Sequence, residues 1–181
     1  MNTELSHLKR LERVHIKRPV YFVTCCAFDR RPVLTLPGVP EILREEWNNA
    51  WKLHGWRIGR FVIMPDHVHF FCCEAPTVAG VGDPGSEQGP ASARPATGRV
   101  KTLSCFVGAW KQWTAKRMTR ELGLHAPIWQ PEFFDHILRS DESYSEKWSY
   151  VRDNPVRAGF VETADRWPHQ GSIHFDVPYG C

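Results

Sequence analysis

The feature that most constrains the fold is a pair of apolar runs separated by a tight turn. The runs WRIGRFVIMP (56–65) and DHVHFFCCEA (66–75) are rich in the β-branched and aromatic residues that are typical of strands. Pro65 and Asp66, at their junction, are typical of a tight turn. The sequence therefore predicts two neighbouring strands that pair as a hairpin.

Other segments predict two more strands and three helices. PVYFVTCCAF, from Pro19, reads as a strand, and a further strand is expected around Phe133 to Leu138. VPEILREEWNNAWKLHG has helical spacing and stops at Gly55. RVKTLSCFVGAWKQWTAKRMTREL (99–122) predicts a second helix, with an apolar stripe of Leu103, Phe106, Val107, Trp110 and Trp113.

A final helix is expected through YSEKWSYVRD. Ser140 can cap its start, and it should end near Asn154 because Pro155 disfavours helical geometry in the residue before it. The order β, α, β, β, α, β, α favours a single α+β domain over 1–181, in which one sheet is covered by helices.

Two segments stand apart from this pattern. Residues 75–98 are dominated by Gly, Pro, Ala and Ser, which predicts a flexible loop, and a C-terminal tail follows from about 160. The apolar runs are too short to predict a membrane span. The N-terminus has no apolar core like that of a signal peptide, so we expect a cytoplasmic protein.

The net charge of +3 is unevenly distributed. Residues 8–18 contain one acid, Glu12, against five bases: Lys9, Arg10, Arg13, Lys17 and Arg18. A local basic stripe is typical of proteins that bind phosphate backbones, although an ordinary solvated flank can have the same composition.

Two histidines separated by one residue, His67 and His69, lie in the second run of the hairpin. On a strand they share one face, with Cα atoms about 7 Å apart, while Val68 points into the core. That separation lets two ring nitrogens reach one metal ion, but it also fits a polar edge that faces water. The spacing alone leaves both interpretations open.

The final helix carries a tyrosine outside its apolar stripe. At about 100° per residue, Tyr144, Trp148 and Val151 cluster within about 60° and form the stripe that packs on the core. Tyr150 lies roughly 130° from the middle of that stripe, and Asn154 follows on its side one turn later. Tyr150 is therefore either an exposed surface residue or a functional one.

Tyrosine, histidine and asparagine at one site have a clear chemical use. The phenol oxygen can attack a phosphodiester and form a covalent phosphotyrosine that conserves the energy of the broken bond. A divalent ion polarises the phosphate and neutralises developing charge. Two imidazoles and an amide carbonyl suit Mn²⁺ and tolerate Mg²⁺. If the fold brings these residues together, they predict metal-dependent cleavage of a nucleic acid.

Three segments resemble the HUH single-strand tyrosine transposases, and in particular the IS200-like branch of REP-associated tyrosine transposases. They are MPDHVHFF (64–71), WQPEFFDHILR (129–139) and YVRDNPVRAGFV (150–161), and the resemblance covers roughly 20–171 in the same order. HVH alone is a weak signal. HVH followed at this distance by YxxxNPVRAG is specific.

The resemblance implies a central antiparallel sheet of the HUH, ferredoxin-like kind and an enzyme that cleaves and rejoins single-stranded DNA. His67 and His69 match paired ligands of Mg²⁺ or Mn²⁺, and Asn154 matches a third, amide-type ligand. Tyr150 matches the nucleophile, which forms a 5′-phosphotyrosine and leaves a free 3′-hydroxyl. The implied substrate is a hairpin, such as a REP-like palindrome, beside a short guide sequence. A nucleoid-associated prokaryotic protein, either monomeric or homodimeric, is expected.

DNA contacts are expected from the basic N-terminal segment and from the second helix. The candidates are Lys9, Arg10, Arg13, Lys17, Arg18, Lys111, Lys116, Arg117 and Arg120. The sequence also departs from the family in two places. The segment 75–98 is longer than expected, and the tail carries RWPHQGSIHF where relatives often have a Trp-Ser-Ser-like string.

Three other functions are compatible with parts of this pattern. A two-histidine phosphodiesterase would carry a second, matching histidine motif, which is missing. A structural zinc module would recruit Cys72 or Cys73, but Cys73 is four residues from His69 on the strand, which is far for one ion. The serious alternative is a non-catalytic, domesticated sequence-specific DNA-binding protein. The retained histidines, tyrosine and asparagine argue against it.

Overall fold

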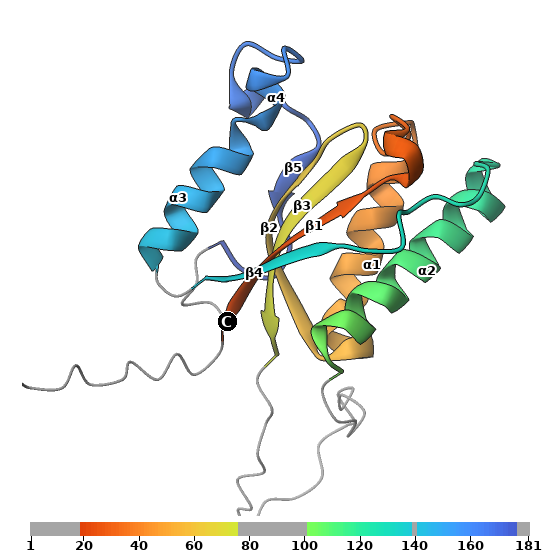
Figure 1. Ribbon diagram of the computed structural model, residues 1–181, viewed down its shortest axis with the longest axis horizontal. Helices are drawn as coiled ribbons and strands as arrows, with labels where there is room; N and C mark the ends of the chain where they lie inside the picture. Colours follow the sequence, from red (N-terminus) through yellow and green to blue (C-terminus); the bar gives the residue numbers. More distant parts are fainter. Residues whose placement is uncertain (1–18, 76–100, 139–140, 177–181) are drawn as a thin grey trace, which may run out of the picture.

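A five-stranded antiparallel sheet forms the centre of the structure (Figure 1). The computed structural model describes residues 19–75, 101–138 and 141–176. The strands are β1 (Val20–Cys26), β2 (Trp56–Ile63), β3 (His67–Glu74), β4 (Phe134–Leu138) and β5 (Gln170–Ser172), in the spatial order β4-β1-β3-β2-β5. The helices are α1 (Val39–His54), α2 (Leu103–Leu122), α3 (Asp141–Arg152) and the single turn α4 (Asn154–Arg157). The predicted α+β fold is confirmed.

The predicted hairpin of β2 and β3 lies in the middle of the sheet. Across its Pro65-Asp66 turn, the N–H of Met64 donates to the carbonyl of His67 at 2.8 Å. β3 also pairs with β1, where Thr24 lies opposite His69. Because β3 is paired on both sides, its register is fixed by two neighbours.

Side chains of β3 alternate between the two faces of the sheet. Val68 and Phe70 enter the larger core, on the side of α1 and α2. Phe71 enters the second core, on the side of α3. His67 and His69 have the same parity as Phe71, so both histidines face the α3 side.

Helices α1 and α2 lie side by side on one face of the sheet (Figure 1). α1 has Pro40 in its first turn and ends at Gly55, whose φ of 76° suits glycine. The hydroxyl of Thr102 caps α2. Trp47 of α1 stacks on Trp110 of α2, with ring centroids 5.2 Å apart. No helix in the described ranges is long and apolar enough to span a bilayer.

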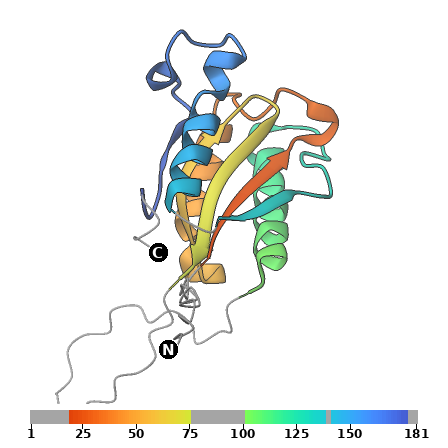
Figure 2. The ribbon, with the colours of Figure 1, turned by 60° about the vertical axis from the view of Figure 1, so that its left-hand side comes forward.

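Helix α3 packs on the opposite face (Figure 2). Tyr144 and Val151 are buried in the second core and Trp148 packs against it, which confirms the predicted stripe. α3 ends at Arg152, close to the predicted end. The suggested cap, Ser140, lies outside the described residues.

The chain beyond Gly159 completes the sheet, which the sequence analysis did not predict. β5 pairs with β2, so that Gly171 lies opposite Phe61. Phe175 is buried and occupies the space beside Gly59, where an added Cβ would lie 2.5 Å from the Cε2 of Phe175. The absence of a side chain at Gly59 therefore allows the C-terminal segment to close over β2.

Gly59→Ala is expected to lower the free energy of unfolding by about 1–3 kcal/mol, because the new methyl group displaces the Phe175 ring. Urea denaturation measures this change. Gly108→Ala is the matched control, since its Cβ would meet nothing within 4 Å. In helix α2 that substitution is expected to raise the stability by about 0.5–1 kcal/mol. Equal stability of Gly59→Ala and the native chain would contradict this account.

Two expectations for α2 are corrected. The helix begins at Leu103, later than 99, because Thr102 serves as its cap. Trp113 was expected on the apolar stripe but is 49% exposed. At about 100° per residue, Trp113 falls roughly 100° from the middle of the buried residues of α2. Thr114 takes the buried position in its place, where its hydroxyl accepts the indole N–H of Trp129 at 2.9 Å.

Ala75 and Lys101, which are distant in sequence, both contact the turn between α1 and β2. The N–H of Ala75 donates to the carbonyl of Gly55 at 2.7 Å, and the indole N–H of Trp56 donates to the carbonyl of Lys101 at 2.7 Å. This turn lies beside the end of β3 that is remote from His67. The predicted flexible loop at 75–98 lies outside the described residues, apart from Ala75.

Candidate active site

Two imidazoles meet at the start of β3. The ring centroids of His67 and His69 lie 4.7 Å apart, with an interplanar angle of 78°. The Nδ1 of His67 lies 2.6 Å from Oδ1 of Asp66, and the Nδ1 of His69 lies 2.8 Å from the hydroxyl of Thr24. Because both Nδ1 atoms are occupied, the Nε2 atoms are the ones left for a ligand.

Asp66 sets the orientation of His67. A carboxylate only accepts hydrogen bonds, so the Nδ1 of His67 is the donor in this contact and its Nε2 points away from Asp66. Asp66 is itself held by Arg30, at 2.8 Å between Nε and Oδ2. Arg30 belongs to the turn η1 (Phe28–Arg30), where its φ of 54° is uncommon for a residue with a side chain.

His69 is partly buried and neutral. Its ring stacks on Phe22, with centroids 5.3 Å apart. Burial is the largest cause that lowers the pKa of His69 to about 3, followed by electrostatic interactions with His67 and with the cations Arg30, Lys147 and Arg157. Neutral imidazole is the form that binds a metal, so His69 is ready for ligation at neutral pH.

The paired histidines fit a divalent metal ion. Their Nε2 atoms are available, and hydrogen bonds to the other ring nitrogens are the usual support of histidine ligands. Within the described ranges, no group of three or more His, Cys, Asp or Glu side chains is placed to hold a metal. The remaining ligands would have to be of another kind, such as an amide oxygen, water or a phosphate oxygen.

Tyr150 lies between two cations on the exposed side of α3. The residue is 61% exposed, which confirms that it lies outside the apolar stripe. The guanidinium of Arg157 lies 4.1 Å from its ring centroid, and the Nζ of Lys147 lies 6.0 Å from it. Cations at these distances interact favourably with the ring and also attract a phosphate.

Lys147 connects the tyrosine with the histidine face. Its Nζ lies 5.3 Å from the ring centroid of Phe22, the same ring that stacks on His69. Tyr150 and the histidines therefore lie on the same side of the sheet, around neighbouring side chains of β1, β3 and α3.

Asn154 begins α4, next to Tyr150 as the helical spacing predicts. Its Oδ1 accepts a hydrogen bond from Nη2 of Arg157. The same Nη2 donates to the carbonyl oxygen of Tyr150 at 2.7 Å. Asn154 is therefore tied to the tyrosine through Arg157, and its role as a metal ligand stays a prediction.

Comparisons with known proteins find relatives along almost the whole chain, although no family model matches it. A REP-associated tyrosine transposase of Escherichia coli (strain K12) is 26% identical over 173 residues, which cover 96% of this chain and 87% of that protein. This chain resembles the REP-associated tyrosine transposases. A Haemophilus influenzae protein described as a "Putative REP-associated tyrosine transposase" is 26% identical over 171 residues. The alignment covers 94% of this chain and 88% of that protein.

A solved REP-associated tyrosine transposase, bound to a REP hairpin, shares the fold. The two structures align with a TM-score of 0.58 at 23% identity, over 90% of this chain and 82% of that one. The expected fold of a REP-associated transposase is thereby confirmed.

Two of the predicted DNA contacts on α2 are used within the fold. Lys111 is buried and its ammonium donates to the carbonyls of Pro131 and Glu132 at 2.8 and 3.1 Å. Its position on the helix falls inside the buried stripe of α2. The guanidinium of Arg117 is paired with three carboxylates, those of Glu45, Glu46 and Glu121. Both side chains have partners within the protein, and their contacts with DNA stay predictions.

Lys116 and Arg120 are exposed, but α2 stands on the face of the sheet opposite His67 and His69 (Figures 1 and 2). They therefore lie on a different face from the two histidines, and their contacts with DNA stay predictions. The five predicted contacts in the basic N-terminal segment lie outside the described residues.

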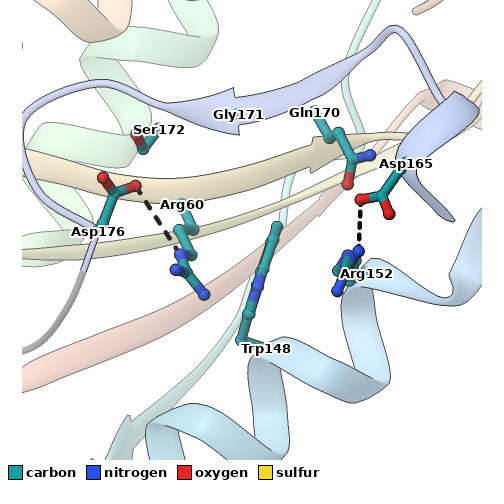
Figure 3. A pocket seen from close by; sticks show the side chains of 8 residues that line it. All are labelled: Arg60, Trp148, Arg152, Asp165, Gln170, Gly171, Ser172 and Asp176. Carbon is teal, nitrogen blue, oxygen red and sulfur yellow. Dashed lines mark hydrogen bonds and ion pairs between the residues drawn. The ribbon is translucent and has the colours of Figure 1, made fainter.

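A separate pocket of about 330 Å³ lies on the other flank of α3, against β2 and β5 (Figure 3). Trp148 stands between Arg60 and Arg152, and both arginines are paired with aspartates of the C-terminal segment. Trp148 and Arg152 are each two residues from Tyr150, so they point away from it. The residues that line this pocket come from β2, α3 and the C-terminal segment, and His67 and His69 are not among them.

The supporting residues of this site were missed by sequence reasoning. Asp66 could have been found, since it precedes His67 in the turn. The others come from elements distant in sequence or from the turn of a helix, and only the sheet register and helix packing reveal them: Thr24, Arg30, Lys147 and Arg157.

Proposed function

We propose that this protein is a metal-dependent transposase or nickase that cleaves and rejoins single-stranded DNA through a 5′-phosphotyrosine. The observation that carries the proposal is the arrangement on one face of the sheet. There, His67 and His69 have Nε2 atoms available to a metal, and Tyr150 lies between Lys147 and Arg157. The names of the two curated relatives support the same class of reaction.

Tyr150 is the proposed nucleophile. Its Oη forms a bond to phosphorus, and the bond from phosphorus to the 3′ oxygen of the preceding nucleotide breaks. The phenolic proton passes to water, and the departing oxygen takes up a proton as the free 3′-hydroxyl. Rejoining is the reverse reaction, in which a 3′-hydroxyl attacks the phosphotyrosine.

His67 and His69 are the proposed ligands of Mg²⁺ or Mn²⁺, with Asn154 as an oxygen ligand. When bound, the ion supplies charge stabilisation at the phosphate. Asp66 and Thr24 hold the two imidazoles through their Nδ1 atoms and leave both Nε2 atoms for the ion. For Asn154 to bind the ion, its Oδ1 has to give up the hydrogen bond that it accepts from Arg157 and take the ion in its place.

The proposed substrate is a DNA hairpin with single-stranded flanks, such as a REP-like palindrome. The solved relative of the same fold is bound to a REP hairpin, which supports this choice. The cations around Tyr150 also suit the phosphates of an unpaired strand.

The test incubates the native protein with a labelled hairpin that carries flanks on both sides, in Mg²⁺ or Mn²⁺. The expected product is a protein–DNA adduct that survives denaturing electrophoresis, with the label on the peptide that contains Tyr150. EDTA should abolish it, and a fully paired duplex of the same sequence should give none. Tight hairpin binding without an adduct in either metal would instead support a non-catalytic DNA-binding protein.

A further inference from the structure

Arg157 contacts several residues of the candidate active site. Neither the YxxxNPVRAG motif nor the comparisons with known proteins assign it a role. Its guanidinium covers the Tyr150 ring at 4.1 Å, and its Nη2 bonds both to the carbonyl of Tyr150 and to Oδ1 of Asn154. It therefore contacts the proposed nucleophile and the proposed oxygen ligand at once.

The guanidinium has unused hydrogen-bonding capacity. A guanidinium has five N–H donors, and in the described part of the chain the recorded bonds of Arg157 come from Nη2 alone. The residue is exposed, and no carboxylate pairs with it among the described residues. Six other arginines of the described ranges do have such a partner: Arg30, Arg60, Arg117, Arg120, Arg152 and Arg166.

An exposed arginine beside a proposed nucleophile, without a carboxylate partner in the described part of the chain, is suited to bind an anion supplied from outside. A phosphodiester oxygen matches the planar fork of a guanidinium better than it matches an ammonium. Lys147 lies farther from the Tyr150 ring and already sits over Phe22. Arg157 is thus the better placed of the two cations to hold a phosphate at the tyrosine.

We propose that Arg157 binds the DNA phosphate that Tyr150 attacks, and that it remains bound to the phosphotyrosine. The proposal rests on the function proposed above. As charge develops on the phosphate oxygens, the Nε and Nη1 donors of Arg157 stabilise it, while Nη2 keeps Tyr150 and Asn154 in place.

The first test measures phosphate contact independently of catalysis. In a Tyr150→Phe background, affinity for a flanked DNA hairpin is measured at several salt concentrations. Arg157→Gln keeps an amide that can donate to Asn154 but loses the charge. It is expected to reduce the slope of log affinity against log salt by about 0.7–0.9, the value for one lost phosphate contact. Arg157→Lys should keep the native slope.

The second test measures adduct formation with Tyr150 intact. Arg157→Gln is expected to slow it about 10²–10³-fold, as the loss of one donor to a developing oxyanion does. Arg157→Lys should recover only part of the rate, because an ammonium lacks the fork. Arg152→Gln is the matched control, since Arg152 pairs with Asp165 on the other flank of α3 and should leave both slope and rate unchanged.

A slope that Arg157→Gln leaves unchanged overturns the proposal, even if the rate falls, because the arginine would then act only on the protein structure. If the native chain forms no adduct, the proposed function fails by itself. The salt slope still decides whether Arg157 holds a phosphate.

Discussion

Replacing Tyr150 with phenylalanine is expected to reduce covalent adduct formation by at least about a thousandfold, as removal of a nucleophile does. The change deletes one hydroxyl from a residue that is 61% exposed. The ring remains, so the contacts of Lys147 and Arg157 with it are retained. A time course on denaturing gels, with the labelled hairpin in excess, measures the rate.

Tyr21→Phe is the matched control. Tyr21 is a partly buried tyrosine of β1 that packs against the larger core, where its ring meets Trp56 edge to face at 5.6 Å. This variant should form the adduct at the native rate. Hairpin affinity should be the same in Tyr150→Phe and in the native chain. An adduct formed by Tyr150→Phe at the native rate would assign the nucleophile to another residue.

The second large effect is expected from the double variant His67→Gln, His69→Gln. Glutamine keeps much of the side-chain volume beside Phe22 but removes both imidazoles. Loss of several kcal/mol of charge stabilisation corresponds to a rate lower by about two to four orders of magnitude. Mn²⁺ binding, followed by calorimetry or electron paramagnetic resonance, should be lost as well.

Two controls accompany the histidine variant. His125 is exposed beyond the end of α2, and His125→Gln should change neither metal binding nor rate. Thr24→Val removes only the partner of His69 Nδ1, for which an intermediate loss of about 10–100-fold in metal affinity is expected. If the double histidine variant binds Mn²⁺ as the native chain does, the metal site lies elsewhere.

Local pattern was enough to predict the framework of the site. Strand alternation placed His67 and His69 on one face, and helical spacing placed Tyr150 outside the apolar stripe. Both predictions are confirmed. They succeed because the repeat of a strand or helix, together with the apolar residues nearby in sequence, decides which face of the element a side chain occupies. The proposed chemical roles of these residues came from their resemblance to a family and remain to be tested.

Long-range packing set the features that could not be predicted. Lys111 looked like a surface base, yet its stem lies in the stripe of α2 and its ammonium is satisfied by two carbonyls of a distant loop. β5 is only three residues long and has weak strand character in sequence. It forms because β2 offers an edge and Phe175 finds space beside Gly59.

The hydrogen bonds of Ala75 and Lys101 to the α1–β2 turn bear on how relatives can diverge. Both ends of the intervening segment are fixed there, and His67 begins β3 at its other end, about 24 Å away along an extended strand. Closing a longer loop between fixed ends costs only about 0.6 kcal/mol for each doubling of length. We therefore expect insertions between these two anchored ends to leave the start of β3 and the position of His67 unchanged, which makes this junction a place for a fluorescent reporter remote from the histidines.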